Sequence, residues 1–199
     1  MAFGLPNVSY IGYPAPMLCA GHAGLGFRQA TPRDLPAIRA HLKRLSPEDR
    51  RARFCASLSE AALDAHAAAL WRRADLVIAA HDGPLWPGPF HTAGEVRALA
   101  EVAIDGREAE IGLSVDGGLR RRGVGTYLVQ TAARLLAPRG VERLLACTLP
   151  NNAAMLRLAR SSGAEIDSGD SEVEIVFDVE ALRQAYLRRR IADHPFRAA

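Results

Sequence analysis

The chain has 199 residues, of which 49% are hydrophobic and 24% charged, as is usual for a globular protein with one main core. The formal net charge of +3 suits an anionic ligand, while an aromatic content of 6% offers few stacking platforms for nucleic acid, which we expect not to be a partner. Three widely spaced cysteines argue against a disulfide framework and against a zinc site, so we expect no metal. No apolar run predicts a membrane span or a secretory signal, so we expect a cytoplasmic protein.

The first part of the chain predicts an arm, a strand and three helices. Residues 1–23 are nearly uncharged and rich in Gly, Pro and Ala, so we expect an irregular arm. A strand is predicted from Gly26 to Thr31. Thr31, Ser46 and Ser59 each have the pattern of a helix N-cap, and the first two are followed directly by proline.

The middle of the chain predicts three strands and a long loop. Asp75 to His81 is an apolar strand, and Glu95 to Ile104 with Ala109 to Val115 form a hairpin. Between them, Gly83 to Gly94 is rich in proline and glycine. This loop either borders an acceptor pocket or is a simple surface connection.

Helices and strands alternate in the last part of the chain. The predicted elements are a helix at Gly125–Ala137, a strand at Val141–Leu149, a helix from Asn152 to Gly163, strands at Ala164–Ile166 and Glu172–Val179, and a last helix from about Glu180, followed by a basic tail at Arg188–Arg190. The order predicts an α/β fold in which helices cover a central mixed sheet.

A glycine pair follows the second strand of the hairpin. Arg120-Arg121-Arg122-Gly123-Val124-Gly125 stands where the strand gives way to a helix, whose first N–H groups have no internal partner. Such a loop predicts a phosphate or pyrophosphate site, and the alternative is a tight turn with a solvated basic cluster. The loop lacks the Lys-Ser/Thr ending of a nucleoside triphosphate loop and the third glycine of a dinucleotide fingerprint.

Two motifs resemble those of the GNAT (Gcn5-related N-acetyltransferase) superfamily. They are Arg120-x-x-Gly123-x-Gly125 and the later segment from Asn152 to Gly163, in the order that the GNAT fold has. The resemblance implies an N-acetyltransferase that uses acetyl-CoA as cosubstrate, with its domain at residues 24–180 and a C-terminal helix and basic tail at 181–199. The cofactor-binding residues that it implies are Ser114, Val115, Arg120, Arg121, Arg122, Gly123, Val124, Gly125, Thr126 and Asn152. Asn152 is equally suited to be a helix N-cap.

A narrower resemblance concerns the acceptor. Leu45–Arg50, followed by Arg53-Phe54, resembles a segment of bacterial protein-lysine acetyltransferase domains, as does the run Met155–Arg160. It implies a protein lysine as the amine. A small-molecule amine acetyltransferase and a CoA-binding sensor without catalysis are the alternatives, and the chain is expected to be a monomer or a homodimer.

Glu110 is the predicted catalytic residue. A lysine ammonium, with a pKa of ~10.4, must lose a proton before it attacks. The resembling enzymes carry a glutamate base at this distance before the loop; the alternative is a solvent-facing carboxylate, and Glu101 is the second candidate base. Where many GNAT enzymes have a tyrosine as general acid, this chain has Ala159. His66 and His81 are expected at a helix surface and a strand end.

Overall fold

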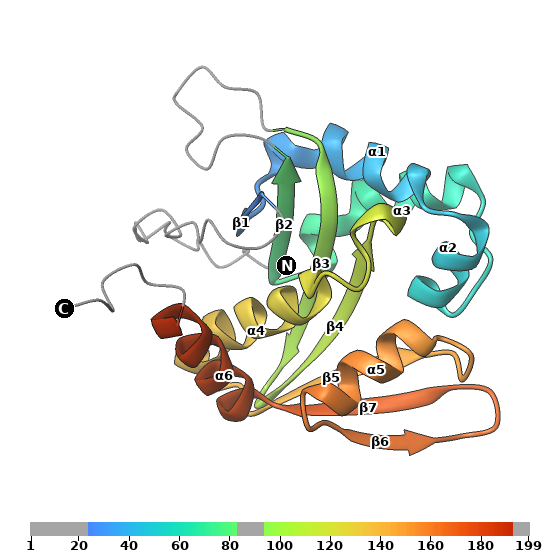
Figure 1. Cartoon of the computed structure of the whole chain (residues 1–199). Helices are drawn as coiled ribbons and strands as arrows, with labels where there is room; N and C mark the ends of the chain where they lie inside the picture. Colours follow the sequence, from blue (N-terminus) through green and yellow to red (C-terminus); the bar gives the residue numbers. More distant parts are fainter. Residues whose placement is uncertain (1–23, 83–93, 193–199) are drawn as a thin grey trace, which may run out of the picture.

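The computed structural model describes residues 24–82 and 94–192 (Figure 1). The arm at 1–23, the loop at 83–93 and the final residues 193–199 lie outside the described residues, so the predictions for them stay predictions.

A seven-stranded mixed sheet forms the centre of the molecule, as the sequence predicts. Its strands are β1 (Leu25–Gln29), β2 (Leu76–Asp82), β3 (Val96–Asp105), β4 (Glu108–Val115), β5 (Arg143–Thr148), β6 (Glu165–Ser168) and β7 (Val173–Asp178). They are arranged in the order β1-β2-β3-β4-β5-β7-β6. Every neighbouring pair is antiparallel except β4 and β5, which run parallel. The sheet therefore changes its pairing mode at its middle.

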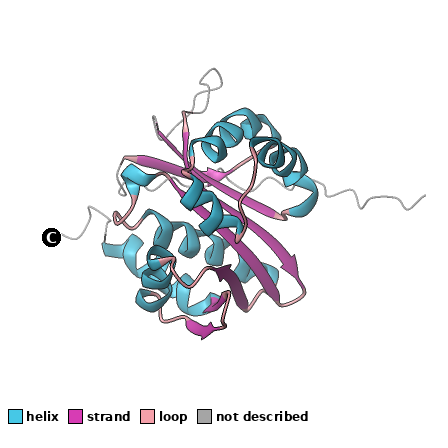
Figure 2. Cartoon of the chain, turned by 90° about the vertical axis from the view of Figure 1, so that its right-hand side faces the viewer, coloured by secondary structure: helices cyan, strands magenta, loops and turns pink. Residues whose placement is uncertain are grey.

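Helices cover both faces of this sheet (Figures 1 and 2). The α-helices are α1 (Leu35–Arg44), α2 (Pro47–Phe54), α3 (Glu60–Arg73), α4 (Val124–Leu136), α5 (Ala153–Ser161) and α6 (Val179–Ala192). Short 3₁₀ turns stand at Pro32–Asp34, Gly117–Leu119 and Ala137–Arg139. Helices α1 and α3 pack on one face, whereas α4 packs on the other face and α6 packs against α4.

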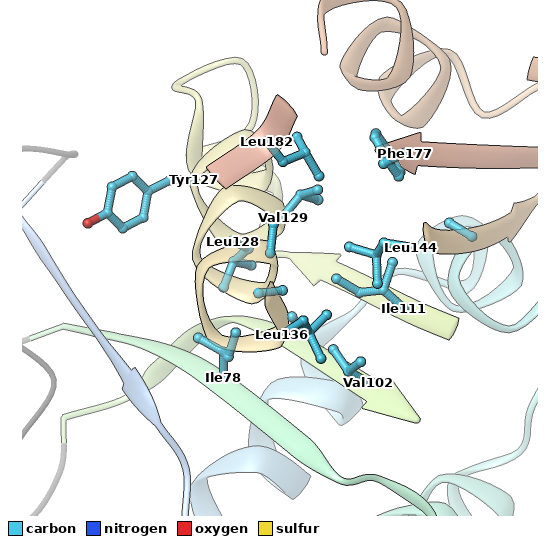
Figure 3. Packing of buried hydrophobic residues seen from close by; sticks show 14 of the residues in the cluster. Ile78, Val102, Ile111, Tyr127, Leu128, Val129, Leu136, Leu144, Phe177 and Leu182 are labelled. Atoms are coloured by element: carbon cyan, nitrogen blue, oxygen red, sulfur yellow. The ribbon is translucent and has the colours of Figure 1, made fainter. Parts of the chain in front are cut away.

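The two faces bury separate apolar clusters. On the α4 side, Val102, Ile111 and Leu144 of the strands meet Leu128 and Leu136 of α4 (Figure 3). The cluster on the other side joins strand residues such as Leu99 to helix residues such as Leu42 and Leu63. Because successive side chains of a strand point to opposite faces, Ile111 is buried beneath α4, and Glu110 and Gly112 point to the opposite face.

The predicted helix starts are confirmed where a side chain caps them. The hydroxyl of Ser46 accepts a hydrogen bond from the N–H of Asp49 at 3.1 Å, and that of Ser59 accepts one from Ala62 at 3.2 Å. At the first helix the N–H of Thr31 donates to the carboxylate of Asp34 at 2.7 Å. These bonds satisfy donors that have no partner inside the helix.

The C-terminal boundaries differ from the prediction. Helix α6 starts directly after β7 and continues through Arg188–Arg190, which the sequence placed in a tail. Arginine is a good helix former and no Gly or Pro interrupts this stretch, so nothing local ends the helix there. Within the described ranges, no helix has both the length and the apolar character that a membrane span requires.

Candidate active site

Strands β4 and β5 separate partway along their length. They pair only at Glu108–Glu110 of β4 and Arg143–Leu145 of β5, and then diverge (Figure 1). From Ile111 to Val115, β4 is paired with β3 along its other edge. The edge that faces β5 therefore leaves main-chain groups of β4 free to bind a ligand in the opening. Two cavities adjoin this opening.

The first cavity, here called the loop cavity, has a volume of about 670 Å³. Residues from α2, the end of β4, the following loop and the first turns of α4 and α5 surround it. Nine of the ten predicted cofactor-binding residues line it, namely Ser114, Val115, Arg120, Arg121, Gly123, Val124, Gly125, Thr126 and Asn152. Arg122 is exposed and is not among its lining residues.

Two glycines shape the floor of the loop cavity for different reasons. Gly123 is the N-cap of α4 and has a φ of 75°, a left-handed conformation that side chains other than glycine rarely adopt. A Cβ at Gly125 would lie 3.0 Å from Cδ1 of Leu158, so this glycine lets α5 pack closely on the start of α4. The free N–H groups of the first turn of α4 thus border a cavity large enough for a phosphate group.

The arginines of the loop have different partners. Arg120 forms an ion pair with Asp49 of α2, which also lines the loop cavity. Arg121 has a φ of 59° and lines the cavity, and among the described residues it has no ion pair. Arg121 is therefore the arginine of this loop that is both at the cavity and available to an anion.

Asn152 uses its whole side-chain amide locally. Its Oδ1 accepts a hydrogen bond from the N–H of Met155 at 3.1 Å, and its Nδ2 donates to the hydroxyl of Thr148 at 2.8 Å. The first bond caps α5, and the second ties that cap to the end of β5. The predicted N-cap role is confirmed, and the residue also lines the loop cavity.

The second cavity, here called the acceptor cavity, has a volume of about 710 Å³. It lies between the end of α2, the length of α3 and the strands β3, β4 and β5. Glu110 is exposed on its wall and, within the described ranges, its side chain has no hydrogen bond or ion pair. Met155 and Asn152 line both cavities, so the two are adjacent.

Glu101, the second candidate base, is buried in a charged cluster on the same wall. It is 8% exposed, and its Oε2 lies 3.0 Å from the guanidinium of Arg53 and 2.8 Å from Nε2 of His66. Burial raises the pKa of Glu101, but the charge of Arg53 and the contact with His66 outweigh burial and bring that pKa below its usual value. The prediction that His66 lies on a helix surface is wrong, because its side chain turns from α3 toward this carboxylate.

A second polar cluster fixes the end of β4. Nε2 of His41, a fully buried residue of α1, lies 2.8 Å from the hydroxyl of Ser114, and its Nδ1 lies 2.9 Å from Asp116. Arg44 and Arg97 also contact the carboxylate of Asp116. Burial raises the pKa of Asp116, and the bonds to His41 and Arg44 more than offset this, so that the pKa is lowered. The side chain of Ser114 is thereby turned toward α1, while its main chain stays at the edge of the opening.

The sequence does not predict His41, Arg53 and His66 as parts of these clusters. His41 and Ser114 stand 73 residues apart, and no local pattern signals their contact. Arg53 had one signal, since it belongs to the segment that resembles lysine acetyltransferase domains. His66 and Glu101 come from different elements, α3 and β3, which only the packing of that helix on the sheet brings together.

Comparisons with known proteins agree with this geometry. The GNAT domain of S. lividans PAT superposes with a TM-score of 0.65 at 23% identity and covers 84% of this chain and 99% of that one. The ribosomal-protein-S18-alanine N-acetyltransferase from Escherichia coli gives a TM-score of 0.55 at 20% identity, covering 78% and 94%. A GNAT-family acetyltransferase from Bacillus anthracis gives 0.59 at 11% identity, covering 80% and 98%. At these identities the likeness shows a common fold.

The sequence itself carries the family assignment. No curated protein sequence matches the chain. The profile of the acetyltransferase (GNAT) family, in contrast, matches residues 48–164, which include α2, the opening between β4 and β5, the loop and α5. The protein is therefore an N-acetyltransferase that belongs to the GNAT family.

Proposed function

We propose that the protein transfers the acetyl group of acetyl-CoA to the side-chain amine of a protein lysine, with Glu110 as the general base. The observation that carries the proposal is the position of Glu110, an unpaired carboxylate on the wall of the acceptor cavity, at the point where β4 and β5 cease to pair. The phosphates of acetyl-CoA would occupy the loop cavity at the start of α4, and the lysine would enter from the acceptor cavity.

The chemistry requires few groups. Glu110 takes the proton of the ammonium, directly or through water, and the amine nitrogen then attacks the thioester carbonyl carbon. An N–H at the free edge of β4 near Ser114 or Val115 stabilises the oxyanion. The C–S bond breaks and CoA leaves as a thiolate, while the nitrogen gives up its second proton to that thiolate or to water. Ala159 is fully buried and has no acidic group. The thiolate therefore leaves without an acid from that position, as a good leaving group can.

The contrast between the two glutamates favours Glu110. Glu101 is held between Arg53 and His66, and its lowered pKa makes it a weaker proton acceptor. We therefore assign Glu101 to positioning Arg53 and His66 on the cavity wall. The lysine acceptor rests on the segment at Leu45–Phe54, whose helix α2 contributes to the walls of both cavities.

Replacement of Glu110 by Gln tests the proposal, because glutamine keeps the shape of the side chain but cannot accept the ammonium proton. We expect acetyl-CoA affinity to stay unchanged and kcat to fall by roughly 10²–10⁴. The loss should shrink as the pH approaches ~10.4, where lysine itself becomes neutral. Steady-state rates with a lysine peptide across this pH range provide the measurement.

The matched control is Glu108→Gln, two residues earlier on the same face of β4, where the carboxylate pairs with the exposed Arg143. It should keep the wild-type pH profile. A Glu110→Gln enzyme that retains wild-type rates near neutral pH would show that Glu110 is not the base. A CoA sensor without catalytic activity would bind acetyl-CoA but would not transfer the acetyl group to any amine.

A further inference from the structure

Three side chains outside the proposed acetyl-transfer residues meet beside the acceptor cavity, which Cys55 and Cys147 line. Cys55 follows the last residue of α2, Cys147 lies on β5, and Glu172 directly precedes β7. The two sulfur atoms lie 3.9 Å apart although the residues are 92 positions apart in the chain. Sγ of Cys147 lies 3.3 Å from Oε2 of Glu172, and the ligand atoms of all three residues are within 4.8 Å of one another.

These separations match those of a shared metal ion. Two thiolates that each lie about 2.3 Å from a tetrahedral Zn²⁺ are roughly 3.8 Å apart, and a thiolate and a carboxylate oxygen on the same ion are roughly 3.6 Å apart. The cluster has 3.9 Å and 3.3 Å. A disulfide, in contrast, would need the sulfur atoms to approach to about 2.05 Å. The spacing is that of two free thiols that lie close enough to bind one ion.

The backbone at Cys55 also serves the cluster. Its φ of 51° places it in the left-handed conformation that commonly ends a helix, and glycine is the usual residue there. A side chain at this position carries a strain cost that glycine would avoid. The left-handed turn at the end of α2 brings the Cys55 thiol beside the thiol on β5.

We propose that Cys55, Cys147 and Glu172 form a zinc site, for which the described residues supply no fourth ligand and leave a position open to water. Two thiolates and one carboxylate are a donor set that Zn²⁺ accepts, and a site with three protein ligands keeps one position free. The ion would join the end of α2, strand β5 and the residue before β7, and the first two of these segments border the acceptor cavity. The wide spacing of the cysteines in the sequence does not exclude the site, because the fold brings two of them together.

Metal titration of the full chain without a histidine tag tests the proposal. The protein is stripped with a chelator, kept reduced with a phosphine, and titrated with Co²⁺ and then with Zn²⁺. We expect one equivalent of Co²⁺ to bind with the strong absorption of thiolate-to-cobalt charge transfer, and Zn²⁺ to displace it. Zn²⁺ should also raise the melting temperature, because it binds the folded chain preferentially.

Variants identify the ligands. Cys55→Ser and Cys147→Ser should lose the charge-transfer band or weaken binding by at least about tenfold, and Glu172→Gln should weaken it less. Glu165→Gln, which removes an exposed carboxylate of β6, is the control and should bind as the wild type does.

Three results would overturn the proposal. The first is the absence of a charge-transfer band in the reduced wild-type protein, and the second is wild-type affinity in Cys55→Ser. The third is a Cys55–Cys147 disulfide. Mass spectrometry would find it in the metal-free protein, and after reduction it would form again even with Zn²⁺ present. Because binding is read spectroscopically, these results do not depend on whether the protein acetylates lysine.

Discussion

Arg53 occupies the space that a side chain at position 112 would fill. A Cβ added to Gly112 would collide with the guanidinium of Arg53, which lies over the β4 backbone and reaches the buried carboxylate of Glu101. The same guanidinium lies 4.9 Å from the ring of Phe54, which packs edge-on against His66. One missing side chain on β4 thus makes room for the cation that neutralises Glu101.

Gly112→Ala tests this arrangement. The added methyl group should displace Arg53, leave Glu101 less well compensated and lower the free energy of unfolding by about 1–3 kcal/mol. The pKa of Glu101 should rise toward its ordinary value because the charge of Arg53, the largest influence that lowers this pKa, is lost. Urea unfolding and an NMR titration of the carboxyl group measure the two effects. Gly118→Ala, where a Cβ meets open space, is the control and should change neither.

At the scale of the elements, the ends of α4 and α5 carry the predicted cofactor site. Helix α4 starts at the left-handed Gly123, and α5 starts at Asn152, whose amide bonds both to Met155 and to Thr148 of β5. Leu158 of α5 packs beside Gly125 of α4, so the two helix starts are held together. The loop cavity depends on where these elements end.

Asn152→Ala should affect stability and ligand binding together. Loss of the cap costs about 1 kcal/mol of unfolding free energy. Acetyl-CoA affinity should also fall, because the start of α5 would no longer be held against β5. Thermal unfolding and calorimetry measure the two effects, with Asn151→Ala, an exposed neighbour that caps no helix, as the control for stability. Lost stability with unchanged affinity would leave Asn152 with the capping role alone.

At the scale of the whole molecule, three carboxylates fasten the layer of α1, α2 and α3 to the sheet. Asp34 joins Arg28 of β1 at 2.9 Å, Glu101 joins α2 and α3 to β3, and Asp116 joins α1 to the end of β4. Burial raises the pKa of each carboxylate, but cationic and hydrogen-bonding partners outweigh it, so all three pKa values are lowered. These groups are therefore stabilising in their charged form.

The lowered pKa values determine how the free energy of unfolding depends on pH. A carboxylate with a lowered pKa in the folded state contributes its full stability above its pKa in the unfolded chain, which is ~4, and loses it as the pH falls through the folded value. We expect the free energy of unfolding to fall steeply in acid below about pH 4. Asp116→Asn should make this decline shallower, and the control Glu165→Gln should not. A decline as steep in Asp116→Asn as in the wild type would show that Asp116 does not contribute to the loss of stability in acid.

The sequence by itself determined the features that depend on neighbours along the chain. Hydrophobic periodicity predicted the strands and helices, Ser46 and Ser59 predicted helix starts, and Arg120–Gly125 with Asn152 indicated the family. Each of these signals is local, because a helix cap, a tight turn or a pyrophosphate loop is built from consecutive residues. The family profile at residues 48–164 confirms that interpretation.

Only the tertiary structure decided which distant side chains meet. Helix packing on the sheet surrounds Glu101 with Arg53 and His66, places His41 against Ser114, and brings Cys55 to Cys147. Glu110 and Glu101 read alike in the sequence, as acidic residues on adjacent strands, yet one is exposed and unpaired within the described ranges while the other is buried and neutralised. That difference arises from contacts between elements far apart in the chain, which no local pattern encodes.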